Sequence, residues 1–222
     1  MHKVQREETL PLIAILRGVS TQDVLRIAHI LIDEGFRIIE VPLNSPNALE
    51  SIRLLVNQFG DDYLIGAGTV TNIIQAKDVV ETGAKLIVTP NMNRDVIMFG
   101  RQNGCEVYPG VVTPTEAFTA LQSGATGLKL FPISMVGIDG LKALKSVLPK
   151  GTLCFPVGGI NPTFESMEPY CKAGADGFGL GSALYKPSMS DEEIRLNAQN
   201  YVDNFIKITN KERKSVDTLV HC

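Results

Sequence analysis

Short apolar runs recur along the chain at intervals of roughly 20 to 26 residues and alternate with longer segments of mixed polarity. Each run is rich in Ile, Leu and Val or bounded by Gly and Pro, which is typical of strands buried in a parallel sheet. The sequence therefore predicts eight such strands, in the runs PLIAIL, RIIEVPL, LIGAGTV, KLIVTP, EVYPGVV, GLKLFP, LCFPVGGI and DGFGLGS.

The segments between these runs have helical periodicity. In the first of them, Ile27, Ile30 and Leu31 line one face, and we expect Thr21 to cap the helix that carries them. The last helical stretch is expected from about Asp191 to Lys211. Glycines stand just before the next strand, where helices usually end, at Gly35, Gly83, Gly104, Gly124 and Gly174.

Eight strand-then-helix units without a break in composition predict an α/β fold, a single-domain (β/α)8 TIM barrel. A doubly wound open sheet is the alternative, because eight repeats alone do not establish closure. We expect the barrel domain to cover residues 1–211 and a polar C-terminal tail to cover residues 212–222.

Composition narrows the classes of function. The 222 residues carry a formal net charge of −3 with scattered charges, so no nucleic-acid partner is expected. No apolar run is long enough to cross a membrane, and the polar N-terminus lacks the apolar stretch of a signal peptide. The four cysteines form no CxxC pair. We expect a cytoplasmic protein without a membrane partner.

Lys129 is the most informative polar residue. Of twelve lysines it alone lies in the middle of an apolar run, between Leu128 and Leu130. Burial there would lower the pKa of its ammonium group and leave an amine able to attack a carbonyl near neutral pH. The alternative is a lysine paired with a carboxylate or reaching solvent.

Glu40 is a carboxylate inside the second run, on the same strand face as Ile38 and Pro42. Even-numbered strands of an eight-stranded barrel share interior layers, so Glu40 on the second strand and Lys129 on the sixth are expected to face each other across the axis. Glu40 would then act as acid–base, unless the two form a buried salt bridge.

Further candidates stand where strands end. Arg17 ends the first strand and suits a carboxylate or phosphate, although a rim ion pair is an alternative. Thr69 offers a hydroxyl and a backbone donor at the end of the third strand. The turns with Gly158 and Gly159, and with Gly181 and Ser182, follow the seventh and eighth strands, where barrels commonly bind phosphate.

No metal-ligating pattern is visible. Of the three histidines, His2 and His221 lie near the ends of the chain and His29 lies in a predicted helix. We therefore expect no cofactor and no metal. An imine formed by Lys129 with a keto group would accept the electrons of the breaking bond instead.

Taken together, several motifs are familiar. The stretch from about Leu10 to Tyr185 resembles the bacterial class I aldolases of 2-keto-3-deoxy-6-phospho sugar acids. The resemblance is carried by LPLIAILRG, EVPLNSP, LIGAGTV, LIVTPN, TPTEA, LKLFP, LKALKSVLP, VGGI and GLGSALY. It implies a (β/α)8 homotrimer that produces pyruvate and D-glyceraldehyde 3-phosphate through a covalent imine.

The resemblance also assigns roles to residues. The Schiff-base lysine falls on Lys129 and the acid–base glutamate on Glu40. The substrate-binding positions fall on Arg17, Asn44, Thr69, Pro90, Gly158, Gly159, Gly181 and Ser182. Relatives acting on the gluconate epimer typically read EVTLRT, with an arginine that binds the carboxylate. Here Asn44 stands at that place and Arg17 is expected to bind the anion, which is the galactonate pattern.

The resemblance thus implies cleavage of 2-dehydro-3-deoxy-6-phosphogalactonate. The gluconate epimer and 4-hydroxy-2-oxoglutarate stay open as substrates. Two other hypotheses are a phosphosugar isomerase or epimerase that uses Glu40 without covalent chemistry, and a non-catalytic phosphosugar-binding barrel.

Overall fold

The computed structural model describes residues 10–220, with side chains through Lys211. Residues 1–9, 221 and 222, with His2, His221 and Cys222, lie outside the described residues. The strands are β1 (Leu12–Ile15), β2 (Ile38–Pro42), β3 (Leu64–Gly68), β4 (Leu86–Val88), β5 (Glu106–Tyr108), β6 (Gly110–Val111), β7 (Leu128–Leu130), β8 (Cys154–Pro156) and β9 (Phe178–Leu180). The helices are α1 (Val24–Asp33), α2 (Ala48–Phe59), α3 (Ile73–Glu81), α4 (Arg94–Gln102), α5 (Pro114–Gln122), α6 (Ile133–Val147), α7 (Phe164–Lys172) and α8 (Asp191–Val220).

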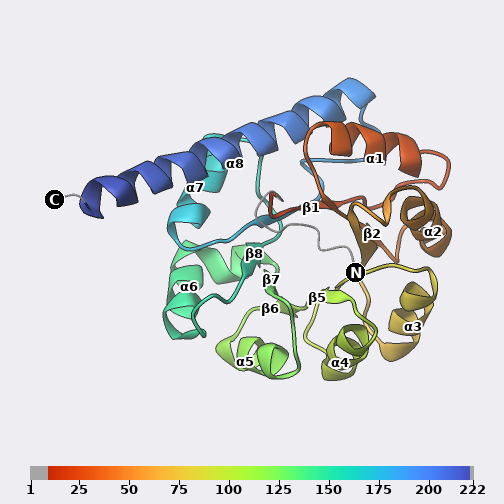
Figure 1. Cartoon of the computed structure of the whole chain (residues 1–222), viewed down its shortest axis with the longest axis horizontal. Helices are drawn as coiled ribbons and strands as arrows, with labels where there is room; N and C mark the ends of the chain where they lie inside the picture. Colours follow the sequence, from red (N-terminus) through yellow and green to blue (C-terminus); the bar gives the residue numbers. More distant parts are fainter. Residues whose placement is uncertain (1–9, 221–222) are drawn as a thin grey trace.

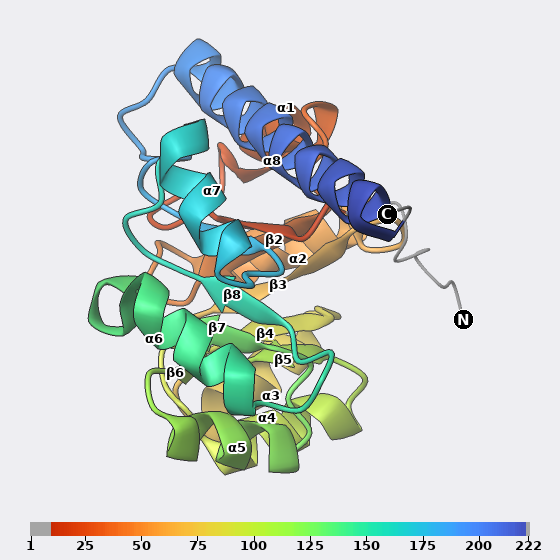
Figure 2. The same cartoon turned by 90° about the vertical axis from the view of Figure 1, so that its left-hand side faces the viewer.

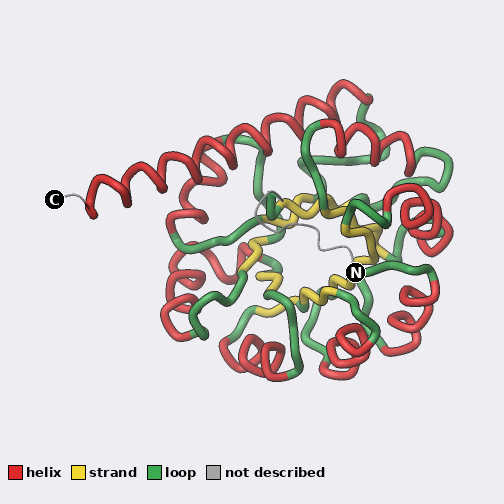
Figure 3. Tube along the Cα trace, viewed as in Figure 1, coloured by secondary structure: helices red, strands yellow, loops and turns green. Residues whose placement is uncertain are grey.

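The strands close into a barrel with the helices outside it (Figure 1). One parallel sheet has the order β5-β4-β3-β2-β1-β9, and a second has the order β6-β7-β8. A parallel bridge between Val157 and Gly179 joins β8 to β9. Because β1 pairs with both β2 and β9, the ring of strands is continuous on that side (Figure 3). The single-domain (β/α)8 fold is therefore confirmed, and the open doubly wound sheet is wrong.

The fifth predicted strand is divided in two. Pro109 lies between β5 and β6, and proline has no backbone N–H to give to a ladder. β5 pairs with β4, whereas β6 pairs with β7. The chain nevertheless continues through this point, so the break does not open the barrel.

Two predictions at helix ends are wrong. Helix α1 begins at Val24 with Asp23 before it, so Thr21 is not its cap; Ser20 and Asp23 organise this turn, with the Asp23 N–H donating to Ser20 Oγ at 3.1 Å. Helix α8 continues beyond Lys211 to Val220, since residues 212–220 contain neither Gly nor Pro to end it. Figures 1 and 2 show its C-terminal part reaching past the barrel.

The core has two parts. The larger one fills the space between the sheet and the helices, and it includes Leu12, Ile39, Ile52 and Phe178. The smaller one lies inside the barrel and consists of Ile13, Ile38, Leu86, Val88, Tyr108 and Phe155. The rings of Tyr108 and Phe155 meet edge to face, with centroids 5.2 Å apart. This interior cluster lines the barrel next to Glu40 and Lys129, since Phe155 is in register with Lys129.

Candidate active site

Two ionisable side chains, one acidic and one basic, are buried inside the barrel. Glu40 on β2 is 1% exposed and Lys129 on β7 is 5% exposed. Glu40 lies in register with Ile15 of β1, and Lys129 lies in register with Phe155 of β8. Because alternate residues of a barrel strand point inward, both side chains face the same interior as the apolar cluster, whose Phe155 is the register partner of Lys129.

Lys129 has the surroundings of a neutral amine. Burial lowers the pKa of its ammonium group, the nearby charge of Glu40 opposes that shift, and the positive charge of Arg17 adds to it. Its Nζ lies 4.8 Å from the ring centroid of Phe131. Among the described residues no ion pair with Lys129 is found, so the interpretation as a salt-bridged structural lysine lacks a partner.

Glu40 is held as a weak acid. Burial raises the pKa of its carboxyl group to about 7, against the opposing charges of Lys129 and Arg17. Within the described part of the chain, Glu40 Oε2 is the one buried side-chain oxygen or nitrogen without a hydrogen-bond partner. Buried polar atoms are nearly always satisfied, so an oxygen left open here is suited to accept from a water or a substrate hydroxyl.

Three residues from consecutive strand ends form a polar cluster at the barrel mouth. Arg17 follows β1, Asn44 follows β2 and Thr69 follows β3. Arg17 Nη1 donates to Asn44 Oδ1 at 2.5 Å, and Arg17 Nη2 donates to Thr69 Oγ1 at 3.4 Å. These contacts hold an exposed guanidinium in place, whose remaining donors are free to bind an anion bidentately.

Thr69 has an unusual backbone. Its φ is +58°, in the left-handed region that β-branched residues avoid. Such strain typically costs about 1–3 kcal/mol and persists where the surrounding structure enforces it. Here it turns the chain sharply after β3, so that the Thr69 hydroxyl meets Arg17.

Two glycine turns present free backbone donors. Gly158 and Gly159 follow β8 with φ of +101° and +75°, and Gly181 and Ser182 follow β9. The N–H groups of these four residues donate to no backbone oxygen in the described part of the chain. A Cβ at Gly159 would meet nothing within 4 Å, so this turn faces open space. Clustered free N–H groups at a barrel mouth are suited to an oxyanion such as phosphate.

Pro90 follows β4, at the same end of the barrel. It is half-buried, and its backbone lies against Gly110, where a Cβ would overlap the Pro90 carbonyl. Every predicted site residue thus lies inside the barrel or just after a strand that runs toward this mouth. That end is where barrels of this kind carry their active sites.

Sequence reasoning missed two neighbours of the pair. Phe131 stands two residues after Lys129 on the same strand face, and this spacing could have indicated that its ring contacts the amine. Gly68 lies directly beneath the carboxyl group of Glu40. Its role depends on how two strands are aligned, which no local pattern reveals.

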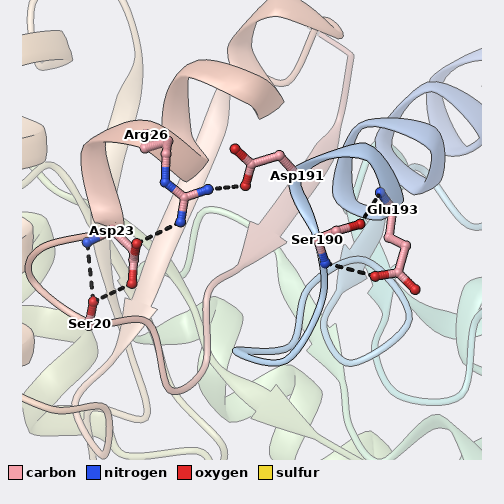
Figure 4. Close-up of polar contacts among 6 residues, drawn as sticks. All are labelled: Ser20, Asp23, Arg26, Ser190, Asp191 and Glu193. Atoms are coloured by element: carbon pink, nitrogen blue, oxygen red, sulfur yellow. Dashed lines mark hydrogen bonds and ion pairs between the residues drawn. The ribbon is translucent and has the colours of Figure 1, made fainter.

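An ion-pair network anchors two of the loops around the mouth (Figure 4). Arg26 on α1 bonds to Asp23 at 2.6 Å and also pairs with Asp191 at the start of α8. Ser190 and Glu193 cap α8 reciprocally, with N–H to oxygen distances of 2.7 and 3.2 Å. The loop that follows Arg17 is thereby tied to the segment that follows Ser182.

Two further findings concern the described residues only. They contain no group of three or more His, Cys, Asp or Glu side chains arranged to hold a metal ion. None of their helices combines the length and the hydropathy that a membrane span needs.

Comparison with known proteins gives consistent matches. The family model described as "KDPG and KHG aldolase" matches residues 4–199. The 2-dehydro-3-deoxy-6-phosphogalactonate aldolase of Escherichia coli (strain K12) is 45% identical over 199 residues, which cover 90% of this chain and 96% of that protein. A solved structure described as native KDPGal superposes with a TM-score of 0.88 at 44% identity, over 90% of this chain and 97% of that chain.

A more distant match is a solved structure that contains a covalent reaction intermediate. The KDPG aldolase of Legionella pneumophila, solved with pyruvate captured at low pH as a covalent carbinolamine intermediate, has a TM-score of 0.75 at 30% identity. The match covers 90% of this chain and 95% of that chain.

Proposed function

Because the chain belongs to the KDPG and KHG aldolase family, a family of carbon–carbon lyases, we propose that it cleaves 2-dehydro-3-deoxy-6-phosphogalactonate to pyruvate and D-glyceraldehyde 3-phosphate. The observation that carries the proposal is the pair inside the barrel: a buried amine without an ion-pair partner and a buried carboxyl group with an open oxygen. Imine chemistry needs both, one as nucleophile and one as proton carrier.

The proposed reaction begins at Lys129. Its neutral Nζ adds to the C2 keto carbon, and the carbinolamine loses water to give a protonated imine. The ionised Glu40 takes the proton of the C4 hydroxyl while the C3–C4 bond breaks and its electron pair flows into the imine. The aldehyde leaves, the resulting enamine is protonated at C3, and water releases pyruvate and the free amine.

The two ends of the substrate would hold the breaking bond in position. We assign the carboxylate to Arg17, supported by Asn44 and Thr69, and the phosphate to the two glycine turns. Fixing both ends orients the C3–C4 bond relative to the imine plane, an effect worth several kcal/mol. Pro90 completes the wall on the β4 side.

The galactonate epimer is the preferred substrate. The galactonate relative and the native KDPGal structure are 45% and 44% identical to this chain, against 30% for the Legionella pneumophila gluconate enzyme. Asn44, which stands in place of the arginine of the gluconate pattern, also favours the galactonate epimer. The gluconate epimer and 4-hydroxy-2-oxoglutarate are less favoured, and no observation favours a non-covalent isomerase or a binding protein.

The test is reductive trapping. Incubation with pyruvate and borohydride should leave a permanent adduct on Lys129, located by peptide mass spectrometry, and should abolish activity. The variant Lys129→Met should form no adduct and release no pyruvate from the substrate. Full activity after borohydride treatment would reject the imine. Pyruvate release from both epimers, measured with EDTA present, tests the substrate and the expected independence from metal.

We also propose a homotrimer in the cytoplasm, with no resident cofactor. Support for the trimer comes from the family resemblance, and light scattering should give three times the chain mass of 24.1 kDa. The buried cysteines Cys105 and Cys154 are free thiols, which fits a reducing compartment.

A further inference from the structure

Gly68 is the last residue of β3, and the carboxyl group of Glu40 occupies the space where a side chain at position 68 would stand. A Cβ built on Gly68 would overlap Oε2 and Cδ of Glu40 and lie 2.5 Å from its Oε1. All three atoms of the carboxyl group at the end of the Glu40 side chain therefore lie close to the Gly68 backbone.

The backbone of Gly68 does not itself require glycine. Its φ is not positive, and it continues the ladder, in register with Pro42 and accepting the Leu43 N–H at 2.9 Å. Gly66, two residues earlier, is different, because a Cβ there would overlap the carbonyl of Leu86, which is backbone and cannot move aside. At position 68 the three atoms nearest to such a Cβ all belong to the carboxyl group of Glu40.

The next residue, Thr69, has a different role in the same site. Thr69 turns out of the strand with its positive φ, and its hydroxyl accepts a hydrogen bond from Arg17. The side chain at position 69 therefore belongs to the polar cluster at the barrel mouth. The missing side chain at 68 leaves room deeper in the barrel. Two consecutive residues thus support two parts of the same site.

We propose that Gly68 is a positioning residue for the aldol cleavage, whose lack of a side chain sets where the Glu40 carboxyl group stands relative to Lys129. The inference rests on the proposed function, since it assumes that Glu40 moves the proton of the C4 hydroxyl. The carboxyl group has to shift away from β3 when any Cβ occupies position 68, and proton transfer is sensitive to displacements of about 1 Å.

The first experiment is Gly68→Ala in the full-length enzyme. We expect kcat to fall by about 100-fold with a change in KM below about 3-fold, because the substrate ends are held elsewhere. Displacement toward the open site lessens the burial of the carboxyl group, so the acid limb of the pH–rate profile should move below pH 7. Borohydride trapping of pyruvate on Lys129 should still reach completion.

A double-mutant cycle separates positioning from general damage. Glu40→Asp shortens the side chain by one methylene and draws the carboxyl group back from position 68. We expect Gly68→Ala to cause no further loss of kcat in the Glu40→Asp background, in contrast to its large effect in the wild type. The double variant also keeps the test valid if Gly68→Ala alone fails to fold, since the overlap is relieved in it.

Gly100→Ala is the matched control. It adds the same methyl group in α4, where Val107 Cγ2 would lie 2.8 Å away and nothing of the site is nearby. We expect a loss of stability without a change in kcat or in the pH profile. Wild-type kcat in Gly68→Ala, or an equal loss in both Glu40 backgrounds, would overturn the inference. If the wild type neither traps pyruvate nor cleaves the substrate, the proposed function fails instead.

Discussion

Glu40 and Lys129 are titratable groups kept almost entirely from water, and this sets the pH at which the site can act. Cleavage needs Glu40 ionised and Lys129 neutral. Burial raises the pKa of the Glu40 carboxyl to about 7 and lowers the pKa of Lys129. Both requirements fail as the pH falls, so the rate should be limited on the acid side.

We predict that kcat falls as the pH drops through about 7, and that Glu40→Gln lowers kcat by about 10² to 10⁴ and removes this limb. The measurement is pyruvate release from pH 5 to pH 9. Glu81→Gln, an exposed carboxylate at the end of α3, should leave the profile unchanged. A limb that persists unchanged in Glu40→Gln would assign the titration to another group.

The same carboxyl group should affect stability. A raised folded-state pKa stabilises the fold fully below the unfolded value of 4.5, and this contribution is lost as the pH rises through about 7. We predict that Glu40→Gln gains stability relative to the wild type between pH 5 and pH 8, by roughly 3 kcal/mol. Loss of the Glu40 charge also lets burial lower the pKa of Lys129 further, which makes stability rise with pH and acts in the same direction. Urea unfolding at the two pH values measures the difference, and an advantage that shrinks with pH would contradict it.

At the level of single residues, the sequence revealed side chains whose type is unusual for their surroundings. A lysine and a glutamate inside apolar runs stand out without knowledge of the fold. The contacts of Arg17 with Asn44 and Thr69 and the overlap at Gly68 depend on strand register. Glycine at a strand end looks the same whether it serves a turn or makes room for a neighbour, so the role of Gly68 could not be predicted.

Among the elements, the turn after β8 offers a test of anion binding with a close control. Gly159 and Gly151 both have positive φ, +75° and +85°, and a Cβ at either would meet nothing within 4 Å. Gly151 precedes β8 and Gly159 follows it, so they lie at opposite ends of the barrel.

We predict that Gly159→Ala and Gly151→Ala both destabilise the fold by about 1 kcal/mol, because alanine resists this conformation. Gly159→Ala alone should raise KM for the phosphorylated substrate about 10-fold and weaken inhibition by inorganic phosphate. Steady-state kinetics with phosphate as inhibitor measures both. Equal KM values in the two variants would show that this turn does not bind the substrate phosphate.

Element types could largely be read from periodicity, and the differences have local causes. All five glycines expected at helix ends have positive φ, from +75° to +103°. Pro109 divided a strand that apolar content alone had suggested was continuous. Helix α8 extends beyond its expected end at Lys211 because residues 212–220 still favour a helix although the apolar periodicity has ended. The boundary of the domain at residue 211 stays a prediction.

Over the whole molecule, the interior cluster is the apolar packing that lies next to the site. Phe155 is 2% exposed, stands in register with Lys129 and packs on Tyr108. Phe178 is 0% exposed but belongs to the outer core, where it packs edge to face on Phe205. The two phenylalanines are therefore both buried, one inside the barrel and one outside it, on the neighbouring strands β8 and β9.

We predict that Phe155→Leu and Phe178→Leu each cost about 1 kcal/mol of stability through loosened packing. Only Phe155→Leu should admit water beside Lys129, raise the pKa of the amine and slow pyruvate trapping at pH 7. Thermal unfolding and the rate of borohydride inactivation give the two readouts. Identical trapping rates would mean that the interior cluster does not control the hydration of Lys129.

Closure by the pairing of β1 with β9 has a consequence during synthesis. The ribosome releases the first strand long before its second neighbour exists, so one edge of β1 waits unpaired while most of the polypeptide is made. A partial chain cannot assemble a pocket that draws on both ends of the sequence, from Arg17 to Ser182. The newly synthesised chain should therefore become able to bind pyruvate covalently in a single late step. Formation of the covalent adduct would then report that the barrel has closed.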